Sequence, residues 1–138
     1  MLARLVGALR PARSRRDPLG PRGERAAAKY LRRRGYRILR RNLVVHTGEA
    51  DLVALAPDQR TLVIVEVKTR RPADHGASAT PPEAAITHHK RRKLLTVAPA
   101  VARKLKMPEA PIRIDVIAID WPARGKPTLR HYEAAVTF

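Results

Sequence analysis

The stretch Leu62–Arg70 reads LVIVEVKTR and decides the fold. Its continuous run of β-branched and aliphatic residues is typical of an inner strand of a sheet that is covered on both faces. Because side chains alternate along a strand, Glu66 and Lys68 share one face with Leu62 and Ile64. An acid and an ammonium are costly in such a setting unless they pair or hold a charged group. We therefore expect this strand to carry an ion pair or a functional site.

The segments on either side of this strand predict a mixed α/β sheet flanked by helices, in the order α-βββ-α-ββ. We expect residues 1–19 to form a basic flexible tail and residues 20–138 to form a single domain. We expect a helix over 22–34 and a second helix from residue 83, which Pro99 kinks or ends, with a short continuation to Lys106. We expect strands over 36–46, 50–56, 62–70, 112–120 and 129–138, with turns at HTGEA (46–50) and PDQR (57–60).

The charge of the chain favours a polyanionic partner. The 138 residues contain 29 Lys and Arg against 12 Asp and Glu, a formal charge of +17. Nucleic acid of some kind is the partner that such a charge indicates, because phosphate neutralisation gives affinity without sequence readout. The absence of cysteine excludes disulfides, thiolate zinc sites and a cysteine nucleophile. No apolar run approaches about 18 residues, so we expect no membrane contact and a cytoplasmic protein.

Acidic residues gather where the chemistry of a site is expected. Asp51 opens the second strand, Glu49 lies two residues earlier in the turn, and Glu66 lies on the neighbouring third strand. If the hairpin closes at PDQR, Asp51 and Glu66 lie near the same end of adjacent strands. Ligands that are all oxygen favour Mg²⁺ or Mn²⁺ over zinc or copper. Lys68, on the same face as Glu66, is suited to position a water or to neutralise charge on a phosphate.

At these residues the chain resembles a known family. GEADLV (48–53) followed after a short turn by VEVKTR (65–70) is similar to the D…ExK core of restriction-endonuclease-like nucleases. More closely, the chain resembles the YraN-like family of predicted bacterial endonucleases, which is related to archaeal Holliday-junction resolvases. The likeness also includes GERAAAKYLRRRGYRILRRN (23–42), KRRKLL (90–95) and RIDVIAID (113–120), so it covers about residues 20–138.

The resemblance implies a metal-dependent endonuclease that acts on DNA, including branched or structured DNA. It implies that Asp51 and Glu66 are metal ligands, that the main-chain carbonyl of Val67 completes the protein ligands, and that Lys68 is the catalytic lysine. An acid on the first helix lines the site in related resolvases, and Glu24 matches it. A homodimer is compatible with the resemblance, because two active sites suit paired incisions.

Each candidate residue also has a structural explanation. In the structural explanation, Glu66 and Lys68 form a simple ion pair on one face of the strand. Glu24 favours the positive end of its helix dipole as a first-turn acid. Glu49 either caps the turn or orients a ligand indirectly. Lys90, within the apolar stripe of the second helix, either extends its ammonium to solvent or contacts a phosphate.

Basic residues around the proposed site are candidates for tracking phosphates, namely Arg70, Arg71, Lys90 and Arg91. Asp115 is interpreted as a structural partner of Arg113 rather than a ligand. Five aromatic residues are too few for a platform that stacks single-stranded bases. Two alternatives to a nuclease stay open: a nucleic-acid-binding protein that keeps the fold without cutting, and a basic structural protein of a large ribonucleoprotein.

Overall fold

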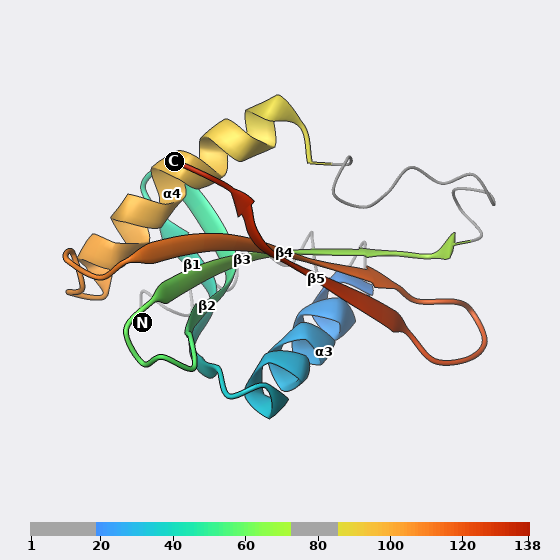
Figure 1. Ribbon diagram of the computed structural model, residues 1–138. Helices are drawn as coiled ribbons and strands as arrows, with labels where there is room; N and C mark the ends of the chain where they lie inside the picture. Colours follow the sequence, from blue (N-terminus) through green and yellow to red (C-terminus); the bar gives the residue numbers. More distant parts are fainter. Residues whose placement is uncertain (1–18, 73–85) are drawn as a thin grey trace, which may run out of the picture.

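The computed structural model describes residues 19–72 and 86–138, which form a five-stranded sheet with a helix on each face (Figure 1). This confirms the mixed α/β class and the order α-βββ-α-ββ predicted from the sequence. The expected tail lies outside the described residues except for Leu19. The elements are α3 (Leu19–Arg33), β1 (Arg37–Val45), β2 (Gly48–Leu55), β3 (Leu62–Arg70), α4 (His88–Lys104), β4 (Ile112–Asp120) and β5 (Thr128–Val136).

The strands lie in the order β1-β2-β3-β4-β5, so β3 occupies the centre of the sheet. The β1–β2 and β2–β3 pairs are antiparallel, as expected for a meander. The crossover through α4 makes β4 parallel to β3, and the two strands pair along their whole lengths, from Leu62 opposite Ile112 to Arg70 opposite Asp120. The last strand, β5, returns antiparallel to β4.

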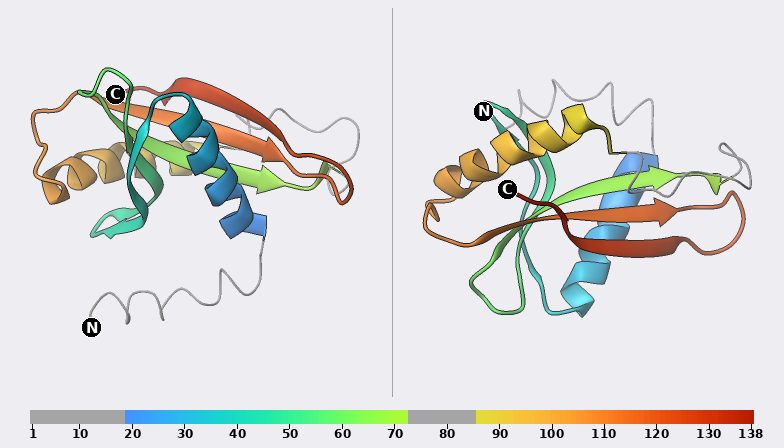
Figure 2. Two further views of the ribbon diagram at one scale, coloured as in Figure 1. Left: turned by 90° about the horizontal axis from the view of Figure 1, so that it is seen from below. Right: turned by 45° about the horizontal axis from the view of Figure 1, so that its top comes forward.

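Two hydrophobic cores bury the two faces of the sheet, one under each helix. Figure 2 gives two further views of the sheet and the helices. This arrangement explains why both alternating sets of β3 side chains are apolar. The core under α4 joins Leu94, Val97 and Val101 to Val53, Leu62, Ile64 and Ile114. The core under α3 joins Ala27, Ala28 and Leu31 to Leu52, Val63, Val65 and Ile117.

Both helices differ from their expected bounds. The first begins three residues earlier than expected, at Leu19, with Pro21 in its first turn. Proline is tolerated there because the first amides of a helix have no partner within it. The expected start of the second helix at residue 83 lies outside the described residues, and α4 itself begins at His88, where the Thr87 hydroxyl accepts a hydrogen bond from the Lys90 amide at 3.1 Å.

Pro99 lies inside α4 and does not end it, so of the two expected effects, a kink or an end, the second is wrong. The helix continues through it to Lys104, short of the expected Lys106. A proline inside a helix costs about 3 kcal/mol, because it removes one hydrogen bond and crowds the preceding turn. The buried residues on both sides, Val97 and Val101, pack into the core under α4 and offset that cost.

The hairpins that flank β2 fix the register that matters for the site. β2 begins at Gly48, so Glu49 lies in the strand and not in a turn as expected. Gly48 adopts φ +152° against α4, where a Cβ would come within 2.9 Å of a Val97 methyl. At the other end of the strand, the Asp58 carboxylate accepts hydrogen bonds from the Thr61 hydroxyl and from the amides of Thr61 and Arg60. These bonds lower the pKa of Asp58 to about 2 and hold the turn into β3.

Candidate active site

Strands β2 and β3 separate at the two predicted metal ligands. Their pairing runs from the turn as far as Leu52 opposite Val65. The next residue on β2 is Asp51, and the next on β3 is Glu66. Beyond this point β2 pairs with β1, whereas β3 pairs with β4. The two carboxylates therefore lie on adjacent strands at the place where their ladder ends.

The Asp51 carboxylate bridges this separation. Its Oδ2 accepts a hydrogen bond from the Val67 amide at 2.9 Å, so Asp51 contacts the backbone of the residue after Glu66. Asp51 is 3% exposed and Glu66 is 6% exposed. Two buried acids thus lie on neighbouring strands where the β2–β3 ladder ends, which is an arrangement that calls for nearby positive charge.

Lys90 supplies positive charge to Glu66 in this structure. Its Nζ lies 2.8 Å from Glu66 Oε1, and its side chain is 48% exposed while that of Glu66 is 8% exposed. Lys90 stands in the first turn of α4, so the start of that helix sets its position. Neither sequence-based reading, extension to solvent or contact with a phosphate, includes this ion pair.

Lys68 lies on the same face of β3 as Glu66, two residues further along, and its side chain is exposed. The structure pairs Glu66 with Lys90 and not with Lys68. A simple ion pair between neighbours on one strand face therefore does not account for the two charges in β3. Lys68 keeps an exposed ammonium beside the buried carboxylates.

Glu24 and Glu49 have different settings. Glu24 is half-buried in the second turn of α3, because the helix begins at Leu19, so its interpretation as a first-turn acid is wrong. The neighbouring Gly23 packs directly on Thr69, which brings this part of α3 to the end of β3. Glu49 is half-buried on β2, two residues from Asp51.

The candidate phosphate-tracking residues surround the end of β3 and the start of α4. Arg70 is engaged by Asp120, with Nε 2.9 Å from Oδ1, and is only 14% exposed. That ion pair favours a structural role for Arg70. Arg71 is half-buried directly after β3. Arg91 is also half-buried, with Nε 3.5 Å from the Ile86 carbonyl.

The donor set suits a hard divalent cation. In the described part of the chain, no three His, Cys, Asp or Glu side chains gather as a metal cluster. The predicted set has a different composition, with two carboxylates, Asp51 and Glu66, and the carbonyl of Val67. One or two carboxylates with further oxygen ligands from water and phosphate are what Mg²⁺ usually takes in a protein. The ammonium of Lys90 at Glu66 shows that this position accommodates a positive charge.

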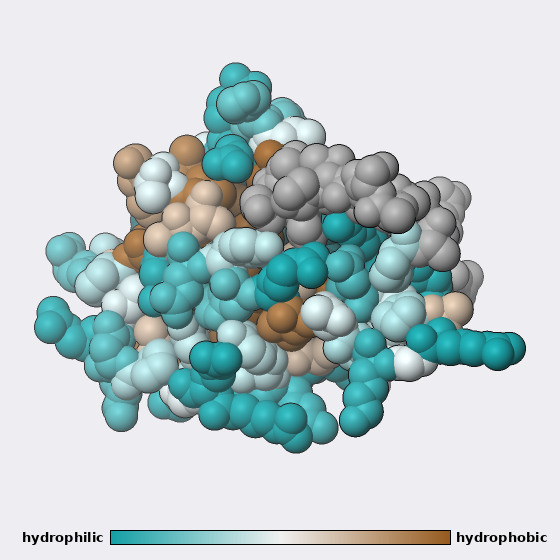
Figure 3. Space-filling model, turned by 45° about the vertical axis from the view of Figure 1, so that its right-hand side comes forward, coloured by the Kyte–Doolittle hydropathy of each residue, from teal (hydrophilic) through white to brown (hydrophobic). Residues whose placement is uncertain are grey.

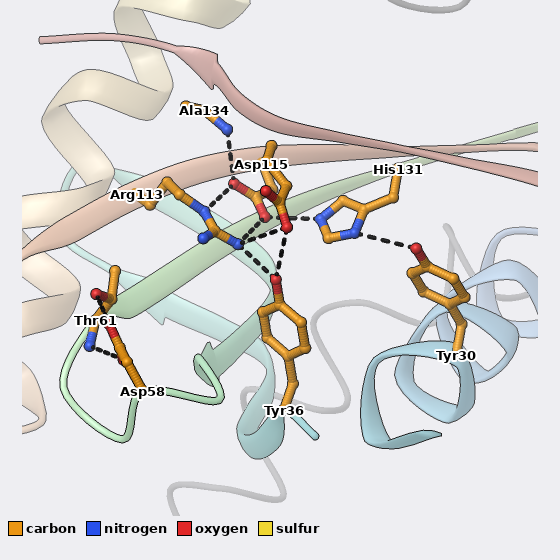
Figure 4. A network of polar contacts seen from close by, with 9 residues as sticks. Tyr30, Tyr36, Asp58, Thr61, Arg113, Asp115, His131 and Ala134 are labelled. Carbon is orange, nitrogen blue, oxygen red and sulfur yellow. Dashed lines mark hydrogen bonds and ion pairs between the residues drawn. The ribbon is translucent and has the colours of Figure 1, made fainter. Parts of the chain in front are cut away.

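A second polar cluster centres on Asp115, which is fully buried on β4 (Figure 4). Both its oxygens lie 2.8 Å from Arg113 nitrogens, its Oδ2 is 2.7 Å from His131 Nε2, and its Oδ1 accepts from the Ala134 amide at 2.9 Å. Burial alone raises the pKa of Asp115, but the hydrogen bonds from His131, Arg113 and Ala134 outweigh it, and the pKa is lowered. The interpretation of Asp115 as a partner of Arg113 is confirmed.

Sequence reasoning missed the rest of this cluster. The Tyr36 hydroxyl accepts a hydrogen bond from Arg113 at 2.6 Å, and the Tyr30 hydroxyl lies 3.3 Å from His131 Nδ1. These residues join α3, the start of β1, β4 and β5. Their spacing in the sequence carries no signal, because the contacts arise only when the sheet and α3 have assembled.

Fold and site together describe a mixed α/β protein with two buried carboxylates where two central strands part. The chain belongs to the uncharacterised protein family UPF0102, whose model matches residues 23–119. A UPF0102 protein of Pelobacter propionicus is 41% identical over 81% of this chain and 77% of its own. Those of Geobacter sulfurreducens and Renibacterium salmoninarum are 43% and 44% identical, each over 82% of this chain, with 84% and 91% of their own lengths covered.

Among solved structures, the chain is similar to Pyrococcus furiosus SfsA in complex with Ca²⁺. The identity is 15%, the TM-score is 0.34, and the match covers 81% of this chain and 60% of the SfsA chain. A likeness at that level carries no argument about this protein. Within the described residues, neither helix is long and apolar enough to cross a membrane.

Proposed function

We propose that this protein is a metal-dependent endonuclease that hydrolyses phosphodiester bonds in DNA. The observation that carries the proposal is that two buried carboxylates, Asp51 and Glu66, lie on adjacent strands one residue beyond the last pair of the β2–β3 ladder. A protein that only binds nucleic acid gains nothing from buried acids beside its phosphate contacts, because like charges repel. The resemblance to restriction-endonuclease-like nucleases supports the proposal, and its resolvase branch favours branched or structured DNA as substrate.

The chain's own residues have distinct roles in this proposal. Asp51 and Glu66, with the carbonyl of Val67, would hold Mg²⁺ or Mn²⁺, and the ion would supply positive charge for the scissile phosphate. Lys68 extends its ammonium toward the same phosphate, where it orients the attacking water and neutralises charge on the phosphate oxygens. Glu49, on the strand that carries Asp51, and Glu24, near the end of β3, act in support.

Lys90 changes partner in this scheme. Its ammonium pairs with Glu66 in the structure. With a divalent ion at Glu66, the Lys90 ammonium would be free to contact the phosphate backbone of the substrate. Its half-exposed side chain has the freedom that this exchange requires.

Cleavage of duplex, flapped and four-way DNA with Mg²⁺ or Mn²⁺ tests the proposal. Asp51→Asn and Lys68→Ala should each reduce the cleavage rate roughly 10²–10³-fold while DNA binding persists. The matched controls are Glu109→Gln and Lys126→Ala, which change exposed residues of the same types away from the site. Cutting that survives both site substitutions, or that needs no metal, would refute the proposal.

The runner-up is a nucleic-acid-binding protein that keeps the fold without cutting. The ion pair between Lys90 and Glu66 favours it, because that pair compensates the buried acid without a metal ion. This alternative predicts tight DNA binding, no cleavage with any divalent ion, and no effect of Asp51→Asn on binding.

A further inference from the structure

A basic groove lies on the face of the sheet opposite to Glu66, between α3 and the segment that joins β4 to β5. Its volume is about 490 Å³, and its lining includes Arg22, Arg25, Lys29 and Arg33 from α3 together with Tyr30 and Trp121. Figure 3 shows hydrophilic side chains gathered along the lower part of the molecule, the side on which α3 lies in Figure 1. The candidate active site does not account for this surface.

The four cations form a continuous stripe along α3. Positions 22, 25, 29 and 33 follow the spacing that aligns side chains on one face of a helix, and all four are exposed. At 1.5 Å per residue the stripe is about 16 Å long. None of the ion pairs formed among the described residues involves any of the four, and the described lining of the groove contains no acid. A stripe of uncompensated cations is complementary to a phosphodiester backbone.

Two of the five aromatic side chains of the protein also line this groove. The guanidinium of Arg22 lies over Trp121 at 4.4 Å from the ring centroid, and that of Arg34 lies over Tyr30 at 4.9 Å. Aromatic rings and guanidinium planes are the surfaces on which unpaired bases stack. The low aromatic content argued against base stacking, but the fold concentrates two aromatic residues beside the cations.

The groove begins close to the candidate active site. The Trp121 amide donates a hydrogen bond to the Arg70 carbonyl at 2.8 Å, and Arg70 is two residues after Lys68. On the same end of β3, Gly23 packs on Thr69. A strand of nucleic acid at Lys68 therefore needs only to pass around the end of β3 to reach α3.

We propose that the groove between α3 and Trp121 binds a single-stranded segment of nucleic acid, the extension of the substrate beyond the site at Lys68. This proposal rests on the proposed function, in which nucleic acid is the substrate. It adds that part of that substrate is single-stranded. The cations contact successive phosphates, and bases stack at Trp121 and Tyr30. Flaps and unpaired arms are the parts of branched DNA that supply such a segment.

The single tryptophan of the chain makes the groove directly observable. The full-length protein in EDTA is titrated with single-stranded DNA, single-stranded RNA and duplex DNA of equal length, with Trp121 emission as the readout. Single strands should quench the emission, and duplex DNA should not. The DNA and RNA arms distinguish the two sources of a single strand. Phosphatidylglycerol vesicles form a further arm, and a larger response to vesicles would overturn the proposal.

Two variants that lose the same amount of positive charge distinguish binding in the groove from attraction to the basic surface in general. One carries Arg25→Gln, Lys29→Gln and Arg33→Gln. The other carries Arg41→Gln, Arg60→Gln and Arg103→Gln, exposed residues that do not line the groove. The groove variant should bind single strands roughly tenfold to hundredfold more weakly, and its log K against log salt slope should fall by about 2. Circular dichroism confirms that both variants are folded.

The binding assay tests the groove independently of the nuclease proposal, because EDTA removes the divalent ions that cleavage would need. If both variants lose the same affinity for single strands, or if the groove variant loses none, the proposal for the groove is refuted. Quenching lost in the groove variant alone supports the groove, even if no metal-dependent cleavage is found. Cleavage of DNA by a protein whose Trp121 emission ignores single strands would support the nuclease and refute the groove.

Discussion

Replacing Lys90 by methionine removes the ammonium 2.8 Å from the buried Glu66 carboxylate while keeping the length and helix propensity of the side chain. At this distance a unit charge pair interacts by about 1.5 kcal/mol in water and about 6 kcal/mol at an effective dielectric constant of 20. Because Lys90 is 48% exposed, the value lies toward the aqueous limit. We expect Lys90→Met to lower the free energy of unfolding by about 1–2 kcal/mol, a fall of roughly 3–8 °C in Tm.

The same variant should bind metal more tightly. In the native protein a divalent ion must displace the Lys90 ammonium from Glu66, whereas in Lys90→Met the carboxylate has lost that competitor. The metal ion no longer has to replace an ion pair worth about 1–2 kcal/mol, so the apparent Mn²⁺ affinity should rise roughly tenfold. Thermal unfolding with and without Mn²⁺ measures both effects, because a ligand of the folded state raises Tm. Arg92→Met, an exposed change on the same helix, is the control. Tighter Mn²⁺ binding by the native protein, or equal behaviour of both variants, would refute the reasoning.

Three further predictions concern stability. Asp115→Asn should cost roughly 2–4 kcal/mol in urea unfolding, because it leaves the partly buried Arg113 without its carboxylate; a loss under 1 kcal/mol would contradict this. Because the pKa of Asp115 is lowered on folding, its contribution to stability is present above about pH 4 and is lost as the pH falls through the folded value, so Asp115→Asn should flatten the acid side of the stability curve. Gly23→Ala should cost about 1–3 kcal/mol, since a Cβ there meets the Thr69 hydroxyl; unchanged Tm would argue against close packing of α3 on β3.

The sequence predicted the central strand, and it predicted that Asp51 on β2 and Glu66 on β3 lie on neighbouring strands. Both predictions have a physical reason. A run that is apolar on both faces identifies an inner strand, and a short turn at 57–60 leaves little freedom in the register of the hairpin. Counting back from that turn brings Asp51 and Glu66 to the same level. Local patterns were sufficient because the two carboxylates lie on one hairpin.

Local sequence patterns could not predict the contacts between segments that are distant in the sequence. The pairing of Lys90 with Glu66 depends on where α4 begins and on how it crosses β3. Residues 71–87 separate the end of β3 from the start of α4 in the sequence. The position of Glu49 in β2 depends on Gly48 packing against α4. The groove joins α3 to Trp121, about a hundred residues later, so the helical spacing of the α3 cations does not by itself reveal the aromatic ring beside them.

Isothermal titration with Mn²⁺ tests the central claim, that Asp51 and Glu66 hold one divalent ion between β2 and β3. The native protein should bind one ion, Asp51→Asn and Glu66→Gln should each lose that binding, and the exposed control Glu109→Gln should retain it. Binding that persists unchanged in both site variants, or a native protein that binds no Mn²⁺ while folded, would contradict the account.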